Sequence, residues 1–160
     1  MNKTDLLQQI ICQMTHDLAV LLSAAKTAHE ASTHEENIPD NKYETLALEA
    51  SYLAQGQANR AQEIKLALEG YKQLALQYFD EDSAIRLTAL VTIEGEDGSS
   101  RTVFIGPHEG GLKVVCDQVE ILVITPQSPL GRVLIGKSVG DLIESGVGSS
   151  RKEFEITEVC

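Results

Sequence analysis

Apolar positions in the first half of the chain recur in alternating steps of four and three residues. The first run consists of Leu7, Ile11, Met14, Leu18, Leu21, Ala25 and Ala28. The second run consists of Tyr43, Ala47, Ala50, Ala54, Gln57, Ala61, Ile64, Leu68, Tyr71 and Ala75. Each run predicts a helix with one apolar seam, and two such helices joined by a short polar segment predict an antiparallel coiled-coil hairpin. The periodicity alone is equally compatible with a generic coiled-coil spacer or a dimerisation element.

The polar segment between the two runs, THEENIPDNKY at residues 33–43, is expected to form the tip of the hairpin. Pro39 has a fixed φ and no N–H, so the first helix should end before it and the second should begin soon after it. Asp40 or Asn41 can cap that second helix. Alanines dominate the seam near this connection, and small side chains let helices approach closely, which predicts a slim tip.

From residue 80 onward the pattern changes to short β-rich runs separated by turn residues. The runs are IRLTALVTI, RTVFIG, GLKVVC, VEILVIT and KEFEITEV, the last at residues 152–159. Asp97 and Gly98 lie between the first two runs and predict a hairpin turn. Ser128 and Pro129 can begin one short helix. We therefore expect an α+β chain with two domains, a coiled-coil hairpin at 1–79 and a small antiparallel sheet domain at 80–160.

Charge narrows the classes of partner. The 160-residue chain has a formal net charge of -11, and its basic residues are scattered singly. Duplex binding needs clustered cations, so a protein with a basic surface, or a cation, fits this chain better than nucleic acid. No apolar run reaches the ~20 residues of a membrane span, and the N-terminus lacks the pattern of a signal peptide, which predicts a cytoplasmic location. Three widely spaced cysteines predict reduced thiols rather than a disulfide framework or a thiolate zinc site.

Two segments look like catalytic motifs but have the wrong spacing or ending. His29, Glu30 and His34 resemble HExxH, yet the two histidines are five residues apart and lie about 140° apart around a helix. The segment GPHEGGLK is rich in glycine but lacks the GK[ST] ending of a phosphate loop, so a tight turn between strands is the better interpretation. No nucleophile and base can be paired by spacing, so we do not expect an enzyme acting by itself.

Three carboxylates, Glu35, Glu36 and Asp40, crowd the predicted tip. One interpretation is a charged turn that serves only solubility. The other is part of a Mg²⁺ site, because neighbouring carboxylates repel each other and a shared hard cation relieves that repulsion. Two or three carboxylates rarely hold Mg²⁺ by themselves. Such a site would therefore need further ligands from a partner.

The segment SPLGRVLIGKSVGDLIE, residues 128–144, resembles the signature of the Gre-type transcription elongation factors (GreA/GreB), and the closing EFEITEV is similar to the last strand of that family. The resemblance implies an FKBP-like second domain that docks at the secondary channel of RNA polymerase. It also implies that the coiled coil enters that channel, where tip carboxylates help to hold a second Mg²⁺. The polymerase's own active site then cleaves a backtracked transcript.

The resemblance assigns roles to individual residues. The tip of cleavage-competent relatives resembles DLKENAEY, and aligning it on Tyr43 places Glu36 at the family's Asp and Pro39 at its Glu, with Asp40 one position later. The implied residues that assist cleavage are Glu35, Glu36 and Asp40, and Glu36 with Asp40 would share Mg²⁺ only in the complex with polymerase. Ser128 and Pro129 match the family's SP pair, and they imply that polymerase is contacted by Gln127, Ser128, Pro129 and Leu130.

The leading hypothesis is thus a monomeric factor that binds RNA polymerase, reaches nucleic acid only through the elongation complex, and has no cofactor of its own. The alternative is a Gre-like regulator or inhibitor that occupies the same channel without stimulating cleavage. A third possibility is a structural coiled-coil protein with an unrelated partner.

Overall fold

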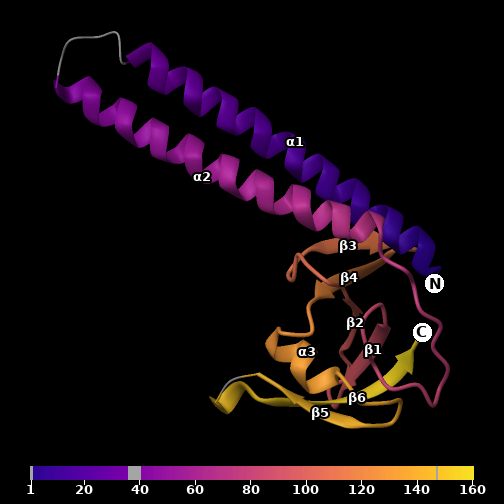
Figure 1. Ribbon diagram of the computed structural model, residues 1–160. Helices are drawn as coiled ribbons and strands as arrows, with labels where there is room; N and C mark the ends of the chain where they lie inside the picture. The colour runs from indigo at the N-terminus through magenta and orange to yellow at the C-terminus, as the bar shows by residue number, and fades with distance from the viewer. Residues whose placement is uncertain (1, 36–40, 147) are drawn as a thin grey trace. The chain divides into compact units, whose positions relative to one another are not determined.

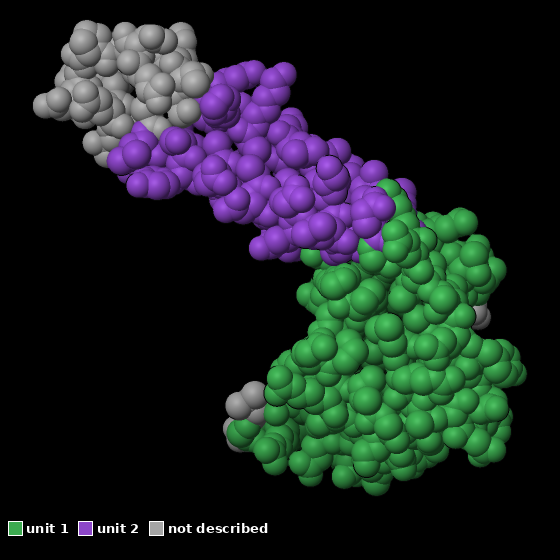
Figure 2. All heavy atoms as spheres, in the orientation of Figure 1, with its two compact units in different colours: residues 1–10, 70–160 green, residues 11–69 purple. Residues whose placement is uncertain are grey.

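The computed structural model describes residues 2–35, 41–146 and 148–160, with side chains except at 32–35, 41–47 and 149. Residues 11–69 form one compact unit, and residues 1–10 together with 70–160 form the other (Figure 2). The predicted domain boundary between 79 and 80 stays a prediction, because compactness does not establish which segment folds independently.

The unit of residues 11–69 is a hairpin of two long helices that run in opposite directions (Figure 1). The helices are α1 (Lys3–Glu35) and α2 (Asn41–Lys72). Among the side chains described between residues 11 and 69, the buried ones are those of Met14, Ala28, Ala61, Ile64, Ala67 and Leu68. All except Ala67 belong to the two predicted seams, so the heptad pattern identified the packed face of the hairpin.

The start of α1 and the end of α2 depart from the predicted seams. Leu6 and Ile10 are fully buried, whereas the predicted Leu7 and Ile11 are only half-buried. Residues 1–10 belong to the compact unit that contains the sheet, so that unit determines which face of the first helical turns is covered. The helix α2 ends at Lys72, and the last predicted seam position, Ala75, lies beyond it and is exposed.

The other unit contains one six-stranded sheet with the order β3-β4-β2-β1-β6-β5. The strands are β1 (Leu90–Gly95), β2 (Ser100–Ile105), β3 (Lys113–Cys116), β4 (Val119–Ile124), β5 (Leu142–Ser145) and β6 (Lys152–Val159). Its helices are α3 (Pro129–Leu134) and a 3-10 turn, η1 (Gly148–Ser150). All pairs are antiparallel except β2 with β4, so the predicted antiparallel sheet domain with one short helix is confirmed with one parallel pair.

Two tight turns connect neighbouring strands. Gly98, with φ 75°, lies in the turn between β1 and β2, and its N–H bonds to the Gly95 carbonyl at 2.9 Å. The turn between β3 and β4 consists of Asp117 and Gln118, which have φ of 51° and 66° without any glycine. Positive φ at both central residues is characteristic of the type I′ turn, which matches the right-handed twist of the flanking strands.

One hydrophobic core holds together the sheet, α3 and the segment of residues 79–89 that precedes β1. Its members include Phe79, Ile85, Val91, Val103, Leu134, Phe154 and Ile156. Thr88 is fully buried beside this core and has φ 71°, an unusual value for a β-branched residue. Its hydroxyl accepts a hydrogen bond from the Gln77 N–H at 2.9 Å, and its own N–H donates to the Ile105 carbonyl at 2.8 Å. These bonds hold residues 85–89 out of the strand, which begins only at Leu90.

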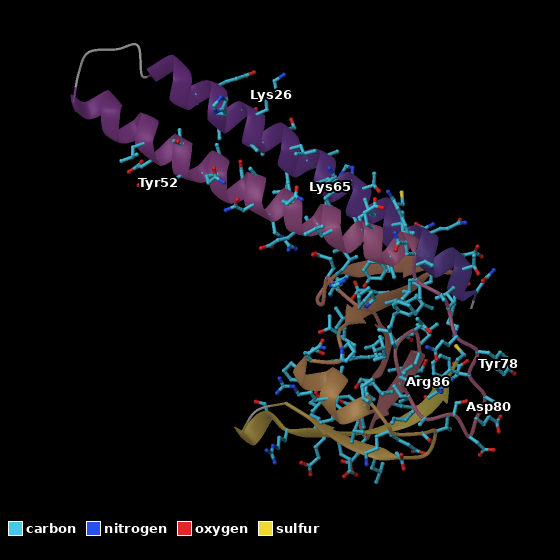
Figure 3. All side chains as sticks on the ribbon, in the orientation of Figure 1. Lys26, Tyr52, Lys65, Tyr78, Asp80 and Arg86 are labelled. Atoms are coloured by element: carbon cyan, nitrogen blue, oxygen red, sulfur yellow. The ribbon has the colours of Figure 1, made fainter. Side chains whose placement is uncertain are left out.

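The first turn of α1 is tied to the segment that follows α2. The Lys3 ammonium donates to the Gln77 carbonyl at 2.5 Å and lies 4.4 Å from the centroid of the Phe79 ring. The Arg86 guanidinium lies 4.5 Å from the same ring. Burial lowers the pKa of Lys3, and this desolvation outweighs the neighbouring Cys160. The labelled residues Tyr78, Asp80 and Arg86 mark this segment in Figure 3.

The end of α2 contacts the glycine-rich loop between β2 and β3. The Tyr71 hydroxyl is buried and donates to the His108 carbonyl at 2.6 Å, and burial raises the pKa of Tyr71. A Cβ on Gly106 would lie 2.2 Å from the Tyr71 hydroxyl oxygen, so only glycine fits there. The segment GPHEGG therefore serves as a turn that receives the tyrosine, rather than as a phosphate loop.

Candidate docking site at the short helix

The predicted docking residues lie at the beginning of α3, and the local sequence explains their geometry. The Ser128 hydroxyl accepts a hydrogen bond from the Gly131 N–H at 3.0 Å and donates one to the Thr125 carbonyl at 2.7 Å. Pro129 occupies the first helical turn, where its missing N–H is not needed. A Cβ on Gly131 would lie 2.0 Å from the Thr125 carbonyl oxygen. The serine caps the helix, the proline fits its first turn, and the glycine leaves room for the Thr125 carbonyl, so the S-P-x-G pattern is explained by the local structure.

The following LIGKSVGD segment anchors the end of the same helix. Leu134 is fully buried, and Gly136, with φ 82°, donates its N–H to the Ile85 carbonyl at 2.8 Å. The Asp141 carboxylate accepts the Ser138 N–H at 2.8 Å, and Gly140 between them has φ 87°. These contacts make the segment a rigid support for α3 rather than a set of reacting groups.

The structure brings the four predicted docking residues together but gives them different surroundings. Gln127 and Pro129 are exposed, whereas Ser128 is half-buried and its hydroxyl is used by the cap. Leu130 is half-buried and packs against the hydrophobic core. Of the four predicted docking residues, Gln127 and Pro129 thus have exposed side chains, whereas Ser128 caps the helix and Leu130 packs against the core.

A groove of about 540 Å³ extends from Pro129 along α3 to β5, and most of its lining belongs to the signature segment at residues 128–144. It is lined by Pro129, Arg132, Val133, Ile135, Lys137, Leu142, Ile143, Glu144, Ser145, Gly146 and Arg151. Figure 1 shows α3 beside β5 and β6. Strand β5 was not predicted, so the groove could not be predicted either; the signal that was available is Arg132, three residues after Pro129 on the same short helix.

The predicted tip residues Glu36 and Asp40 lie outside the described residues, as does the side chain of Glu35 at the end of α1. Among the side chains that the structure does describe, no group of three or more His, Cys, Asp or Glu residues is arranged to hold a metal ion. The described part of the hairpin between residues 11 and 69 carries exposed side chains such as Tyr52 and Lys65, which are labelled in Figure 3. In the described part of the chain, no helix has the length and apolar character needed to cross a membrane.

The part of the chain that contains the sheet and the candidate docking site matches a known family. The sequence profile described as "Transcription elongation factor, GreA/GreB, C-term" matches residues 80–160, which is half of the chain. The chain therefore belongs to the GreA/GreB family of transcription elongation factors.

Particular relatives show how far this similarity extends. The chain is 36% identical over 77 residues to "Transcription elongation factor GreA" from Rhodospirillum rubrum, which is 47% of this chain and 45% of that protein. The chain thus matches less than half the length of this curated relative. Two solved structures are also similar: Gfh1 of Thermus thermophilus has 20% identity and TM-score 0.39, covering 94% of each chain. A GreA/GreB factor of Nitrosomonas europaea has 16% identity and TM-score 0.38, covering 68% of this chain and 88% of that one.

Proposed function

We propose that this protein binds RNA polymerase at its secondary channel and modulates paused or backtracked elongation complexes. The observation that carries the proposal is the exposed pair Gln127 and Pro129, presented by a capped helix inside the region that matches the GreA/GreB profile. The hairpin supports it, because a slender two-helix element suits insertion into a channel. The site of action is the cytoplasm, and the active form is a monomer without a cofactor of its own.

In this proposal the protein assists a reaction that the polymerase performs. Glu35, Glu36 and Asp40 would add negative charge near the polymerase active site, and Glu36 with Asp40 would hold a Mg²⁺ ion together with ligands of the polymerase. Carboxylate oxygens are the ligands that Mg²⁺ prefers, and a metal ion activates water for hydrolysis of the transcript. The chain contributes ligands and position, not a complete active site.

One feature of the sequence favours the alternative function, which is binding to the channel without stimulating cleavage. Pro39 occupies the position where cleavage-competent relatives carry their second carboxylate, and Asp40 follows one residue later. Proline also fixes the backbone at that point. A protein with this tip would act as a competitor of cleavage-stimulating factors.

A backtracked elongation complex distinguishes these functions. The complex is incubated with Mg²⁺ and the protein, and RNA shortening is followed together with competition against a GreA protein. Shortening with competition supports the leading function, and competition without shortening supports the alternative. If the protein neither shortens RNA nor competes, both functions are wrong and the chain binds a different partner.

Two variants separate docking from the action of the tip. Glu36→Ala combined with Asp40→Ala is expected to abolish any cleavage while binding is retained. Pro129→Ala is expected to weaken binding and cleavage together, because it removes an exposed contact without removing the cap at Ser128. Each variant is thus the control for the other. Unchanged cleavage by the double variant would contradict the role of the tip.

A further inference from the structure

We propose that two copies of this chain associate through an uncharged groove on the helical hairpin and form a weak dimer in which the two hairpins pack as a four-helix bundle. The hairpin groove has a volume of about 740 Å³ and lies between α1 and α2, within the unit of residues 11–69. It is lined by His16, Ala19, Val20, Ser23, Ala24, Thr27, Ala28, Ala31, Ala50, Leu53 and Gln57. This inference goes beyond the proposed function and does not depend on it.

The hairpin groove combines exposed apolar side chains with a floor of small ones. Val20 on α1 is 54% exposed, and Leu53 on α2 is 57% exposed. The more buried lining residues are Ala24, Ala28 and Ala50, which carry only a methyl group. The protruding side chains of one copy can fill the alanine floor of the other, as knobs fill holes in coiled coils. One surface thus offers both the knob and the hole, which is what a two-fold symmetric interface requires.

The helix α1 carries a second stripe of small and apolar residues beside its seam. Val20, Ala24, Thr27 and Ala31 follow one another in steps of four, three and four residues, and all four line the hairpin groove. The Thr27 hydroxyl donates to the Ser23 carbonyl of its own helix at 3.1 Å, so it can be covered without losing that bond. A helix that packs against one neighbour needs a single stripe, whereas a wider stripe is typical of a helix in a bundle.

Charge favours a second copy over a partner with a charged surface. The described residues that line the hairpin groove include no Asp, Glu, Lys or Arg. The whole chain has a formal net charge of -11, so two copies repel each other least where their surfaces are free of charge. Nucleic acid would need clustered cations, and a basic protein would need carboxylates. The lining of this groove offers neither.

Gln57 gives an independent indication that the groove becomes covered. Its side-chain oxygen is buried and accepts no hydrogen bond from the described residues of the chain. A buried acceptor without a donor destabilises a protein, so such groups usually have a partner. Ser23 and His16 line the same groove, and in a dimer these donors of the second copy can reach the oxygen of Gln57.

The dimensions of the hairpin groove predict that the dimer is weak. The α1 residues that line it lie between 16 and 31, a length of about 24 Å, and two helices side by side are about 20 Å wide. Each copy would cover about 500 Å², so the interface would be smaller than the ~1,600 Å² of a standard protein complex. Interfaces of this size are transient, so we expect a dissociation constant of about 10–100 µM and a monomer at lower concentrations.

Sedimentation equilibrium of the full chain, at concentrations on both sides of this dissociation constant, tests the inference. The average mass is expected to rise from 17.4 kDa toward twice that value. Val20→Glu combined with Leu53→Glu is expected to weaken the dimer at least about thirtyfold, because it places unpaired carboxylates in the interface. Both positions are exposed, so far-UV circular dichroism should show intact folding.

The matched control is Leu22→Glu combined with Leu66→Glu, which makes the same change in charge on the same two helices. These leucines are 54% and 65% exposed and are not among the residues that line the hairpin groove. The control is expected to dimerise like the wild type. If the wild type keeps a mass of 17.4 kDa throughout, the inference is wrong. It is also overturned if the Val20 and Leu53 variant dimerises like the wild type, or if the control loses the dimer as well.

Discussion

Gly131 provides a direct test of how the short helix α3 is held in place. In an ordinary exposed helix position, replacing glycine by alanine stabilises the helix by about 1 kcal/mol. At Gly131 the added Cβ would lie 2.0 Å from the Thr125 carbonyl oxygen and 2.9 Å from the Ser128 hydroxyl oxygen. Both neighbours are part of the turn that caps α3, so the helix and the turn must separate to admit the methyl group.

The expected magnitude follows from the bonds that this separation breaks. The Ser128 hydroxyl would lose its bonds to the Gly131 N–H and to the Thr125 carbonyl, and the Ser128 N–H would lose its 3.0 Å bond to the same carbonyl. Three hydrogen bonds at about 1 kcal/mol each exceed the gain in helix propensity of about 1 kcal/mol. Gly131→Ala should therefore destabilise the protein by about 2 kcal/mol.

Gly56 on α2 is the matched control, because it is exposed and a Cβ added there has no heavy atom within 4 Å. Gly56→Ala should stabilise the hairpin by about 0.5–1 kcal/mol, the opposite sign for the same substitution. Urea unfolding followed by far-UV circular dichroism measures both changes. Hydrogen exchange followed by mass spectrometry should show that the backbone amides between residues 125 and 137 exchange faster in Gly131→Ala than in the wild type. If Gly131→Ala is as stable as the wild type, close packing against the turn is not what holds this helix.

Three further substitutions test other contacts, each by urea unfolding. Ser128→Ala should cost about 1 kcal/mol through the lost cap, and it should also weaken binding to polymerase. Lys3→Met should cost about 1 kcal/mol by removing the cation over the Phe79 ring and the bond to the Gln77 carbonyl; no change would contradict that tie. Burial raises the pKa of Tyr71 above its ordinary 10.0, because the buried hydroxyl is held in its neutral form. The stability that the neutral hydroxyl adds to the folded state is therefore complete below pH 10 and is lost as the pH rises. Relative to Tyr71→Phe, the wild type should lose up to about 1.4 kcal/mol per pH unit above pH 10, and equal slopes would contradict this.

The local patterns of the sequence predicted the elements that depend on local chemistry. The heptad seam correctly placed Met14, Ile64 and Leu68 inside the hairpin, because a helix buries one face at a fixed period. The last strand was predicted at its observed bounds from the apolar Phe154, Ile156 and Val159, which are all buried, although a register shift against β1 interrupts the alternation between Ile156 and Val159. The first turns of α1 were predicted on the wrong face, because the residues that cover Leu6 lie far away in the sequence, where no local period reports them.

The candidate site shows the same division between local and distant information. Ser128 and Pro129 could be found because a cap and a first-turn proline have a local signature. The groove beside them could not, because it requires β5 to lie against α3, and the LIES segment is too short to have a clear period. The parallel pairing of β2 with β4 was likewise hidden, since β3 lies between these strands in the sequence and no local pattern reports which distant strands pair.

The hairpin is inserted between two parts of the sequence that belong to the same compact unit. Residues 1–10 and 70–160 form one body, so residues 11–69 are an insertion into it, and both ends of the insertion are helical. Removing or adding one heptad in each arm would keep the two seams in register while changing the length of the insertion by about 10 Å. The length of the hairpin can thus be changed in whole heptads without any change to the sequence of Leu6, Tyr71 or the sheet.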